Sequence, residues 1–409
     1  MSLRRSRLLA VALTCAVATT LAGCNSDSET PGAAGEPGTV QSDDSSPSAE
    51  ETEPAVPPVK LLSNVKKGAR DVPVDTRLTV EAENGTLQAV SLTSAAGEVP
   101  GEMSGDNATW VAGSLLEPGM TYAVTTVARR SDGTDVTKRS SFRTVDLTLD
   151  QQTYPSVAPL DGETVGVGMP VIVSFDVAVT DKANIEKHLK VSATPKQPGA
   201  WHWISDHEVH WRPKTYWRAG TDVAVDVDIN SVPAGAGIFG QEDRHVEFHV
   251  GSANIYKVNA QTHQMQVFSN GKLLRTIPIT TGKPGFTTRS GVKVIIEKFR
   301  QKRMNSETIG IGKNNPEYYD LDNVEYAMRV TYSGEFIHAA PWSVGSQGYA
   351  NVSHGCTGMS TADAGWLYAM SRRGDVVEYT GTDRQMEFTN GYGDWNESFA
   401  TYAEGSALK

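Results

Sequence analysis

Short strand-like runs of apolar residues, several of them alternating with polar ones, recur through residues 59–250 and predict a structure built mainly of β-strands. Such runs lie at residues 78–82, 87–92, 121–127, 141–145, 171–175, 208–211, 223–229 and 246–250. Alternation with a period of two places every second side chain on one buried face, as in a strand. Turn-forming pairs such as Asn84-Gly85 separate the runs. Short strands separated by turns at this spacing predict β-sandwiches.

A weak internal repeat divides this part of the chain into two units. Trp110 and Trp211 lie 101 residues apart, and so do Gly119 and Gly220. A period of about 100 residues is the size of an immunoglobulin-like domain. We therefore predict two tandem immunoglobulin-like β-sandwiches, at residues 59–145 and 146–250, with no catalytic constellation in either.

The pattern after residue 251 predicts a third, mostly β domain with one helix, at residues 251–380. Strand-like runs recur at 254–258, 264–268, 273–280, 292–297 and 375–380. Apolar spacing at residues 361–370 predicts the helix, with Thr361 as its N-cap. Residues 299–326 are polar and irregular, which is typical of a functional lid or of a mobile surface loop.

Residues 1–24 have the pattern of a lipoprotein signal peptide. Three arginines precede an apolar run at residues 8–21, which is short for a membrane span. The sequence Leu-Ala-Gly-Cys that follows matches a lipobox, so we expect lipidated Cys24 to anchor the protein at the extracytoplasmic face of the membrane. An ordinary signal peptide is the alternative. Residues 25–58 hold eight acids and no bases, which predicts a disordered acidic linker.

Composition narrows the functional classes. The chain of 409 residues carries a net charge of −11 and has no basic run or patch, so we expect no nucleic-acid partner. Its histidines and cysteines show no metal-ligand spacing, since His245 and His249 lie in a strand-like run where they need not converge. We expect no metal, no cofactor and a monomer, although no residue pattern determines the oligomeric state.

The glycine-rich stretch at residues 338–360 contains the candidate chemistry. Cys356 is the only cysteine after residue 24, with His338 upstream and His354 two positions before it. An imidazole can accept the thiol proton, and a turn at Gly355 can direct the amides of residues 355 and 356 toward one point, as an oxyanion hole requires. A buried structural cysteine is the competing interpretation. The stretch reads as a loop, and an unpaired thiol in an exported protein favours a catalytic use.

Two motifs in this stretch resemble those of the L,D-transpeptidases of bacterial cell-wall synthesis, above all the actinobacterial members. They are H-x-A-P-W-S-x-G-x-x-G from position 338 and S-H-G-C ending at position 356. The resemblance covers residues 255–409, and two β-domains precede it in the same order. It implies that Cys356 is the nucleophile, that His338 is the base, and that the backbone carbonyl of Ala339 orients the imidazole. We also place His354 in the catalytic site, where we expect it to hold the turn at 353–355 or to contact substrate, and we expect Gly355 to supply an oxyanion amide.

The same resemblance implies where substrate and tail lie. Residues 299–326 become the active-site flap, and the tail at 381–409 is expected to pack on the domain at 146–250. Ala339 and Gly358 depart from the pattern, since relatives often carry Ser or Gly at the first position and Asn at the second. The residues expected to bind substrate are Tyr319, Met304, Trp342, Ser353 and Asn351.

The implied reaction is peptidoglycan L,D-transpeptidation. The thiolate attacks the diaminopimelate carbonyl of a tetrapeptide stem, D-Ala leaves, and the amine of a second stem receives the acyl group to form a 3-3 cross-link. Carbapenems are the implied covalent inhibitors. Transfer of stems to a protein amine and a silent wall-binding lipoprotein are the alternatives. Papain-like enzymes place Cys before His, and sortases carry a T-L-x-T-C motif that this chain lacks.

Overall fold

The computed structural model describes residues 57–408. The predicted signal peptide with Cys24, and the predicted linker up to residue 56, lie outside the described residues. The described part is mainly β, as the sequence predicts, and its α-helices are Lys182–Glu186 (α1), Thr361–Met370 (α2) and Phe399–Ala403 (α3). No helix in this part of the chain is long and apolar enough to cross a membrane.

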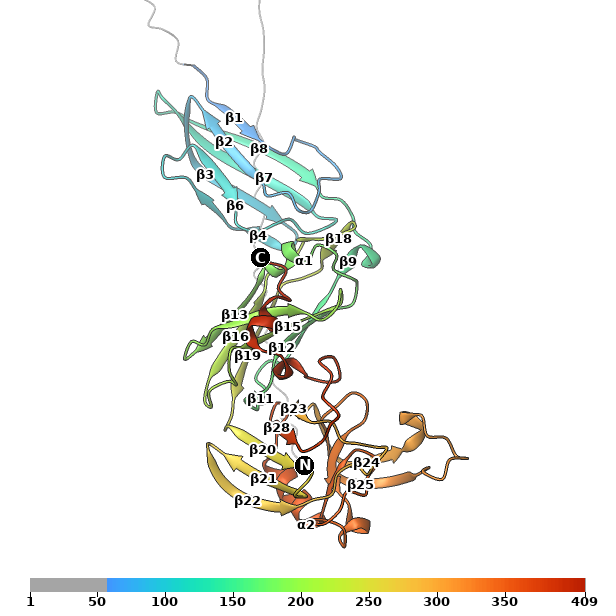
Figure 1. Cartoon of the computed structure of the whole chain (residues 1–409). Helices are drawn as coiled ribbons and strands as arrows, with labels where there is room; N and C mark the ends of the chain where they lie inside the picture. Colours follow the sequence, from blue (N-terminus) through green and yellow to red (C-terminus); the bar gives the residue numbers. More distant parts are fainter. Residues whose placement is uncertain (1–56, 409) are drawn as a thin grey trace, which may run out of the picture. The chain divides into compact units, whose positions relative to one another are not determined.

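Residues 60–143 form two four-stranded sheets around one apolar core (Figure 1). One sheet has the order β1 (Lys60–Ser63), β2 (Thr79–Glu83), β6 (Thr109–Ala112) and β5 (Gly101–Met103). The other has the order β4 (Gly97–Val99), β3 (Gly85–Ser94), β7 (Thr121–Arg130) and β8 (Asp135–Arg143). Every second residue in the middle of β7 is buried, which is the period of two that the sequence predicts.

Residues 152–250 form a second sandwich. One sheet has the order β10 (Pro155–Ala158), β12 (Val171–Phe175), β15 (Glu208–Pro213) and β14 (Gly199–Trp203). The other has the order β11 (Thr164–Val165), β19 (Arg244–Val250), β16 (Asp222–Val227) and β13 (Leu189–Thr194). A small third sheet has the order β17 (Pro233–Gly235), β18 (Ile238–Gly240) and β9 (Gln152–Thr153).

The two sandwiches share local details that fit the internal repeat. Trp110 on β6 covers Gly101 of the neighbouring strand, and Trp211 on β15 covers Gly199 in the same way. A Cβ on either glycine would lie 2.1 or 2.2 Å from the tryptophan ring, so each position requires the absence of a side chain. The turn glycines of the repeat also correspond, since both adopt a positive φ: Gly119 at 66° and Gly220 at 79°.

Residues 254–380 contain two further sheets and α2. The first sheet has the order β22 (Lys272–Pro278), β21 (Gln264–Ser269), β20 (Asn254–Asn259), β28 (Val376–Thr380) and β23 (Gly291–Val294). The second has the order β24 (Glu297–Asn305), β25 (Asp320–Arg329), β26 (Phe336–Ala339) and β27 (Thr357–Met359). Side chains from both sheets and from α2 share one buried cluster, which includes Tyr256, Ile337 and Leu367.

Two sequence predictions in this domain are wrong in detail. The stretch 299–326 is not irregular throughout, because β24 and β25 pair as a long antiparallel hairpin that carries the short 3-10 helix Ser306–Ile309 (Figure 1, orange). The N-cap of α2 is Ser360 and not Thr361, since the Ser360 side chain accepts from the backbone amide of Asp363. Both errors arise from local polarity, which does not reveal strand pairing or the φ at which a helix begins.

One strand of the third domain belongs to two cores. Val377 of β28 lies in the cluster with α2, whereas its neighbour Val376 lies in the core of the second sandwich. Likewise, Ile295 lies in the cluster with α2, and its neighbour Val294 lies in the core of the second sandwich. Because successive side chains of a strand point to opposite faces, this strand region closes the core of both domains.

The tail also contacts the second sandwich. The Trp395 indole, in the 3-10 helix Asp394–Asn396, donates to the carbonyl of Gly168 at 2.8 Å. The buried Asp394 carboxylate accepts from His210 at 2.8 Å. Arg212 of β15 lies over the Trp395 ring with 4.8 Å to its centroid. These contacts join the last residues of the chain to a sheet formed about 200 residues earlier.

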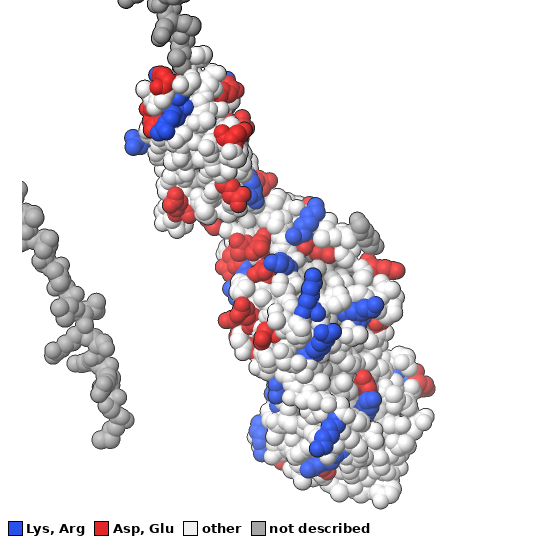
Figure 2. All heavy atoms as spheres, turned by 90° about the vertical axis from the view of Figure 1, so that its left-hand side faces the viewer, with Lys and Arg blue, Asp and Glu red and all other residues white. Residues whose placement is uncertain are grey.

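The surface of the molecule carries charges of both signs. On the face seen in Figure 2, Lys and Arg side chains and Asp and Glu side chains are scattered over a larger uncharged surface.

Candidate active site

His338 and Cys356 come together at the edge of the second sheet of the third domain. His338 lies on β26, and Cys356 directly precedes the parallel strand β27, in which Gly358 is the register partner of His338. Both residues line one cavity of about 330 Å³. Met304, Tyr319, Trp342, Ser353 and His354 line it as well. Parallel pairing therefore brings together two motifs that the sequence separates by a glycine-rich crossover.

The His338 ring is held in a form that can accept a proton. The ring is buried, and its Nδ1 lies 2.8 Å from the carbonyl oxygen of Ala339. A carbonyl can only accept, so Nδ1 carries the hydrogen and Nε2 keeps its lone pair. Burial lowers the pKa of His338 from its ordinary value. The Trp342 ring stacks against it with 5.8 Å between centroids, so the base is neutral and oriented.

The Cys356 thiol is also neutral at rest. Its Sγ lies 3.7 Å from the carbonyl oxygen of Gly334, to which the thiol donates. Burial raises the pKa of the thiol to about 11. A raised thiol pKa beside a lowered imidazole pKa disfavours a stable thiolate–imidazolium pair. Both groups are therefore expected to be uncharged in the free protein.

Two sequence-based assignments need correction. The backbone amide of Gly355 donates to Ser353 Oγ at 3.1 Å, so it is not free to bind an oxyanion in this structure. The Asn351 side chain does not line the cavity, because its amide is used inside the fold. Its Oδ1 accepts from the amide and hydroxyl of Thr281 at 3.0 and 2.8 Å and from His263, and its Nδ2 donates to the Ala260 carbonyl. Asn351 therefore anchors the loop from inside the fold and does not line the cavity.

The nucleophile loop, residues 351–356, owes its shape to short-range hydrogen bonds. The Ser353 hydroxyl donates to the carbonyl of Cys356 at 2.6 Å while accepting from the Gly355 amide. The Thr288 hydroxyl donates to the Gly355 carbonyl at 2.7 Å. Ser353 lines the cavity, as expected of a substrate-binding residue, but its hydroxyl is already occupied with holding the turn.

His354 connects this loop to the flap, residues 299–326. Its Nε2 lies 2.7 Å from Oε2 of Glu317, which also accepts from Lys283. The His354 ring lies between Phe286, with 4.6 Å between centroids, and Tyr319, with 5.0 Å. Glu317 and Lys283 are not evident from the sequence, because an isolated acid and an isolated base in polar stretches carry no distinguishing pattern.

The flap contributes side chains to the lining of the cavity. Tyr319 and Met304 line the cavity at Cys356, and both also line a second cavity of about 300 Å³ that Cys356 shares. The nucleophile can thus be approached from two sides of the flap. Residues 57–408 contain no group of three or more His, Cys, Asp or Glu side chains placed to hold a metal ion.

Comparison with known proteins identifies this architecture. Residues 253–378 match the model of the L,D-transpeptidase catalytic domain, and residues 69–233 match that of a bacterial Ig domain. L,D-transpeptidase 2 of Mycobacterium tuberculosis is 35% identical over 350 residues, which cover 85% of each chain. The chain belongs to the L,D-transpeptidase family. It is an acyltransferase of cell-wall peptidoglycan.

Further L,D-transpeptidases are similar over most or part of this chain. L,D-transpeptidase 5 of Mycobacterium tuberculosis is 33% identical over 88% of this chain and 79% of its own. A solved structure of an L,D-transpeptidase in complex with imipenem is 38% identical and covers 55% of this chain and 97% of that one, with a TM-score of 0.49.

In this L,D-transpeptidase, Gly358 lies where a side chain would be crowded. A Cβ at this position would lie 2.8 Å from Cβ of Ala340 and 3.1 Å from Cγ2 of Thr280. Gly358 forms part of the cavity lining, so a side chain would also take up space beside His338. The absence of a side chain at Gly358 therefore leaves room in the cavity.

Proposed function

We propose that Cys356 forms a thioester with the third residue of a peptidoglycan tetrapeptide stem and passes it to the amine of a second stem, giving a 3-3 cross-link. The observation that carries the proposal is the neutral pair at one cavity: a thiol and an imidazole whose Nδ1 is bound to the Ala339 carbonyl. Such a pair performs acyl transfer without a cofactor.

In the acylation step, the thiol proton passes from Cys356 to His338 and then to the leaving amine. Sγ attacks the diaminopimelate carbonyl carbon as Nε2 of His338 takes the thiol proton. The tetrahedral intermediate then collapses, the bond to the terminal D-Ala nitrogen breaks, and His338 returns the proton to that leaving amine. The backbone amide of Cys356 is the proposed donor for the oxyanion, since that of Gly355 is engaged with Ser353.

The second step reverses these roles. The amine of the acceptor stem attacks the thioester carbon, His338 accepts one of its protons, and the C–S bond breaks. The sulfur then recovers a proton from His338. The two cavities that share Cys356 provide separate approaches for donor and acceptor, with Tyr319 and Met304 of the flap between them.

The proposal is tested by incubating the purified protein with tetrapeptide stems and recording mass spectra. Cross-linked dimers that have lost one D-Ala, absent with Cys356→Ala, are the expected products. Release of D-Ala without dimers would indicate a hydrolase and would contradict the transfer step. Adding a protein amine as competitor shows whether stems are instead attached to protein.

We also propose that lipidated Cys24 anchors the enzyme to the extracytoplasmic face of the membrane. The Leu-Ala-Gly-Cys sequence at residues 21–24 supports this. Cell fractionation of a Cys24→Ala variant tests it: the variant should be released or should keep its leader. Recovery of that variant in the membrane fraction at mature size would contradict the anchor.

A further inference from the structure

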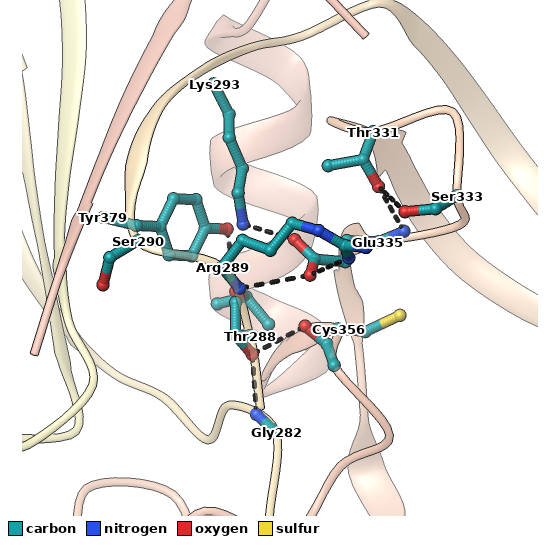
Figure 3. A network of polar contacts seen from close by, with 12 residues as sticks. Gly282, Thr288, Arg289, Ser290, Lys293, Thr331, Ser333, Glu335, Cys356 and Tyr379 are labelled. Atoms are coloured by element: carbon teal, nitrogen blue, oxygen red, sulfur yellow. Dashed lines mark hydrogen bonds and ion pairs between the residues drawn. The ribbon is translucent and has the colours of Figure 1, made fainter. Parts of the chain in front are cut away.

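Directly behind the nucleophile lies a cluster of buried charges that the reaction scheme does not use. It consists of Arg289, Lys293 and Glu335, here called the buried ion cluster (Figure 3). The Lys293 side chain is 0% exposed and that of Glu335 is 7% exposed. Burying charged groups is costly even when they are paired, so such a cluster beside a catalytic cysteine calls for an explanation.

Glu335 is the centre of this cluster. Its Oε2 accepts from Lys293 Nζ, and its Oε1 accepts from Nη1 and from the backbone amide of Arg289 at 3.0 and 3.2 Å. Lys293 Nζ also lies 3.8 Å from the centroid of the Tyr379 ring. Arg289 has a second carboxylate partner in Glu387, whereas Glu335 is the one carboxylate that pairs with Lys293 among the described residues.

The backbone of Glu335 is equally well held. Its amide donates to the Thr331 hydroxyl at 2.8 Å, and its carbonyl accepts from the amide of Val330 at 3.0 Å. Both ends of this residue are therefore anchored, the backbone in the turn between β25 and β26 and the carboxylate on two cations.

Both segments that contact the sulfur lie against Glu335. The preceding residue, Gly334, supplies the carbonyl to which the Cys356 thiol donates. On the other side, a Cβ on Gly355 would lie 3.7 Å from Cγ of Glu335, so this glycine rests on the glutamate side chain. Moving the Glu335 carboxylate would shift the acceptor of the thiol and the support of the nucleophile loop together.

We propose that Glu335 and Lys293 form a positioning pair for the nucleophile, which holds the two backbone segments around Cys356 and sets the electrostatic field at its sulfur through opposite charges. The assignment rests on the proposed role of Cys356 as nucleophile. It adds to the known chemistry two residues that touch no substrate and act through Cys356.

The opposite charges predict opposite effects on the thiol. In the protein interior charges interact over several ångströms with little screening. Glu335 raises the pKa of the thiol, whereas Lys293 and Arg329 lower it and the backbone amide of Phe336 lowers it as well. Burial raises the pKa of Tyr319 and of Tyr379 and lowers that of His338, so these three neighbours carry no charge at neutral pH. Arg289 pairs with Glu335, and His354 lines the same cavity as Cys356. The field at the sulfur is thus a balance that one substitution on either side disturbs.

The experiment compares Glu335→Gln, Lys293→Met and the double variant in the mature protein. The rate of iodoacetamide reaction at Cys356 is measured between pH 6 and 9, with peptide mass spectrometry to locate the label. This rate follows the thiolate fraction and does not depend on transpeptidation, so it distinguishes this proposal from the proposed function. Relative to the wild type at pH 8, we expect about tenfold faster labelling for Glu335→Gln and about tenfold slower labelling for Lys293→Met.

The double variant should label within about threefold of the wild type, because both charges are removed together. Loosening of the fold alone would accelerate labelling in both single variants. Changes of the same sign in the two folded single variants, or no change in either, would overturn the proposal. If a single variant fails to fold because it buries an unpaired charge, the rate of carbapenem acylation of the double variant tests the proposal. A wild-type acylation rate there would overturn the positioning role, and a rate reduced about tenfold at near-normal labelling would support it.

Discussion

His354 and Glu317 join the nucleophile loop to the flap, with 2.7 Å between Nε2 and Oε2. The flap hairpin makes this contact beside Tyr319, whose ring lies on the same imidazole. The His354 side chain thus contacts the flap, whereas His338 is the residue that we propose as the base.

Glu317→Gln should slow carbapenem acylation about three- to tenfold, because the flap loses its charged contact with His354 and Lys283. Thermal stability should change by no more than about 2 °C, since exposed ion pairs contribute little. Glu325→Gln is the matched control, because its exposed pair with Arg300 lies on the same hairpin away from the loop. Equal slowing by both variants would show that the contact between Glu317 and His354 has no specific role in acylation.

Tyr319→Ala should reduce acylation about tenfold while leaving the fold intact. The ring lines both cavities at Cys356 and packs on His354, so its removal widens the site where the acyl donor is held. Stopped-flow measurement of acylation checks this. Tyr318→Ala, the adjacent tyrosine on the same flap segment, should retain the wild-type rate. An unaltered rate in Tyr319→Ala would reduce the flap to a surface hairpin.

Substitution of the three site residues separates their roles. A carbapenem should give one adduct per chain on Cys356, and Cys356→Ala should remove it. His338→Ala should slow its formation by roughly 100- to 10,000-fold without changing the stoichiometry, the range for a positioned general base. His354→Ala should cost far less, because this ring acts through the flap. A larger loss in His354→Ala than in His338→Ala would reverse the assignment of the base.

The pH dependence of acylation reports on the neutral pair. Burial lowers the pKa of His338 below its ordinary value of 6.5, so the base stays unprotonated through neutral pH and is lost only when the pH falls well below that value. Acylation should therefore be level between about pH 7 and 9 and decrease in acid. An enzyme that used only its free thiolate, with a pKa of about 11, would instead gain about tenfold per pH unit over this range.

Trp395→Ala should destabilise the protein by about 2 kcal/mol, less than for a fully buried tryptophan. The side chain is half-buried, donates to the Gly168 carbonyl and packs edge-on against Tyr216 with 4.7 Å between centroids. Thermal unfolding monitored by calorimetry checks this. Tyr349→Ala removes an aromatic ring that is 82% exposed and should leave the melting temperature unchanged. Similar melting temperatures for both variants would mean that the tail does not contribute to stability.

Elements with a clear period could be predicted from the sequence. The strand Val171–Phe175 and the helix Thr361–Met370 lie where the apolar pattern places them. Periodicity is a local property, because one buried face of an element imposes it on the sequence. It can therefore be recognised without knowing which other element packs against that face. The His338–Ala339 contact could also be inferred, because family motifs record it.

Other features depend on partners far away in the chain. Asn351 was expected in the cavity, yet its amide is satisfied by Thr281 and Ala260, which lie on a different part of the fold. Glu335 and Lys293 are 42 residues apart and meet only after two sheets have formed. The local sequence around a single charged residue is the same whether its side chain is exposed to solvent or buried next to a nucleophile.

The strand β28 is shared by two cores, with Val376 on one face and Val377 on the other. The catalytic domain therefore depends on the second sandwich to cover part of its apolar surface. A fragment cut at residue 251 would leave Val294, Ile296 and Val376 without their apolar neighbours and should aggregate. The smallest unit that can be transplanted into another protein therefore begins near residue 146. Residues before that point can be shortened or exchanged without uncovering the apolar face that the catalytic domain shares with the second sandwich.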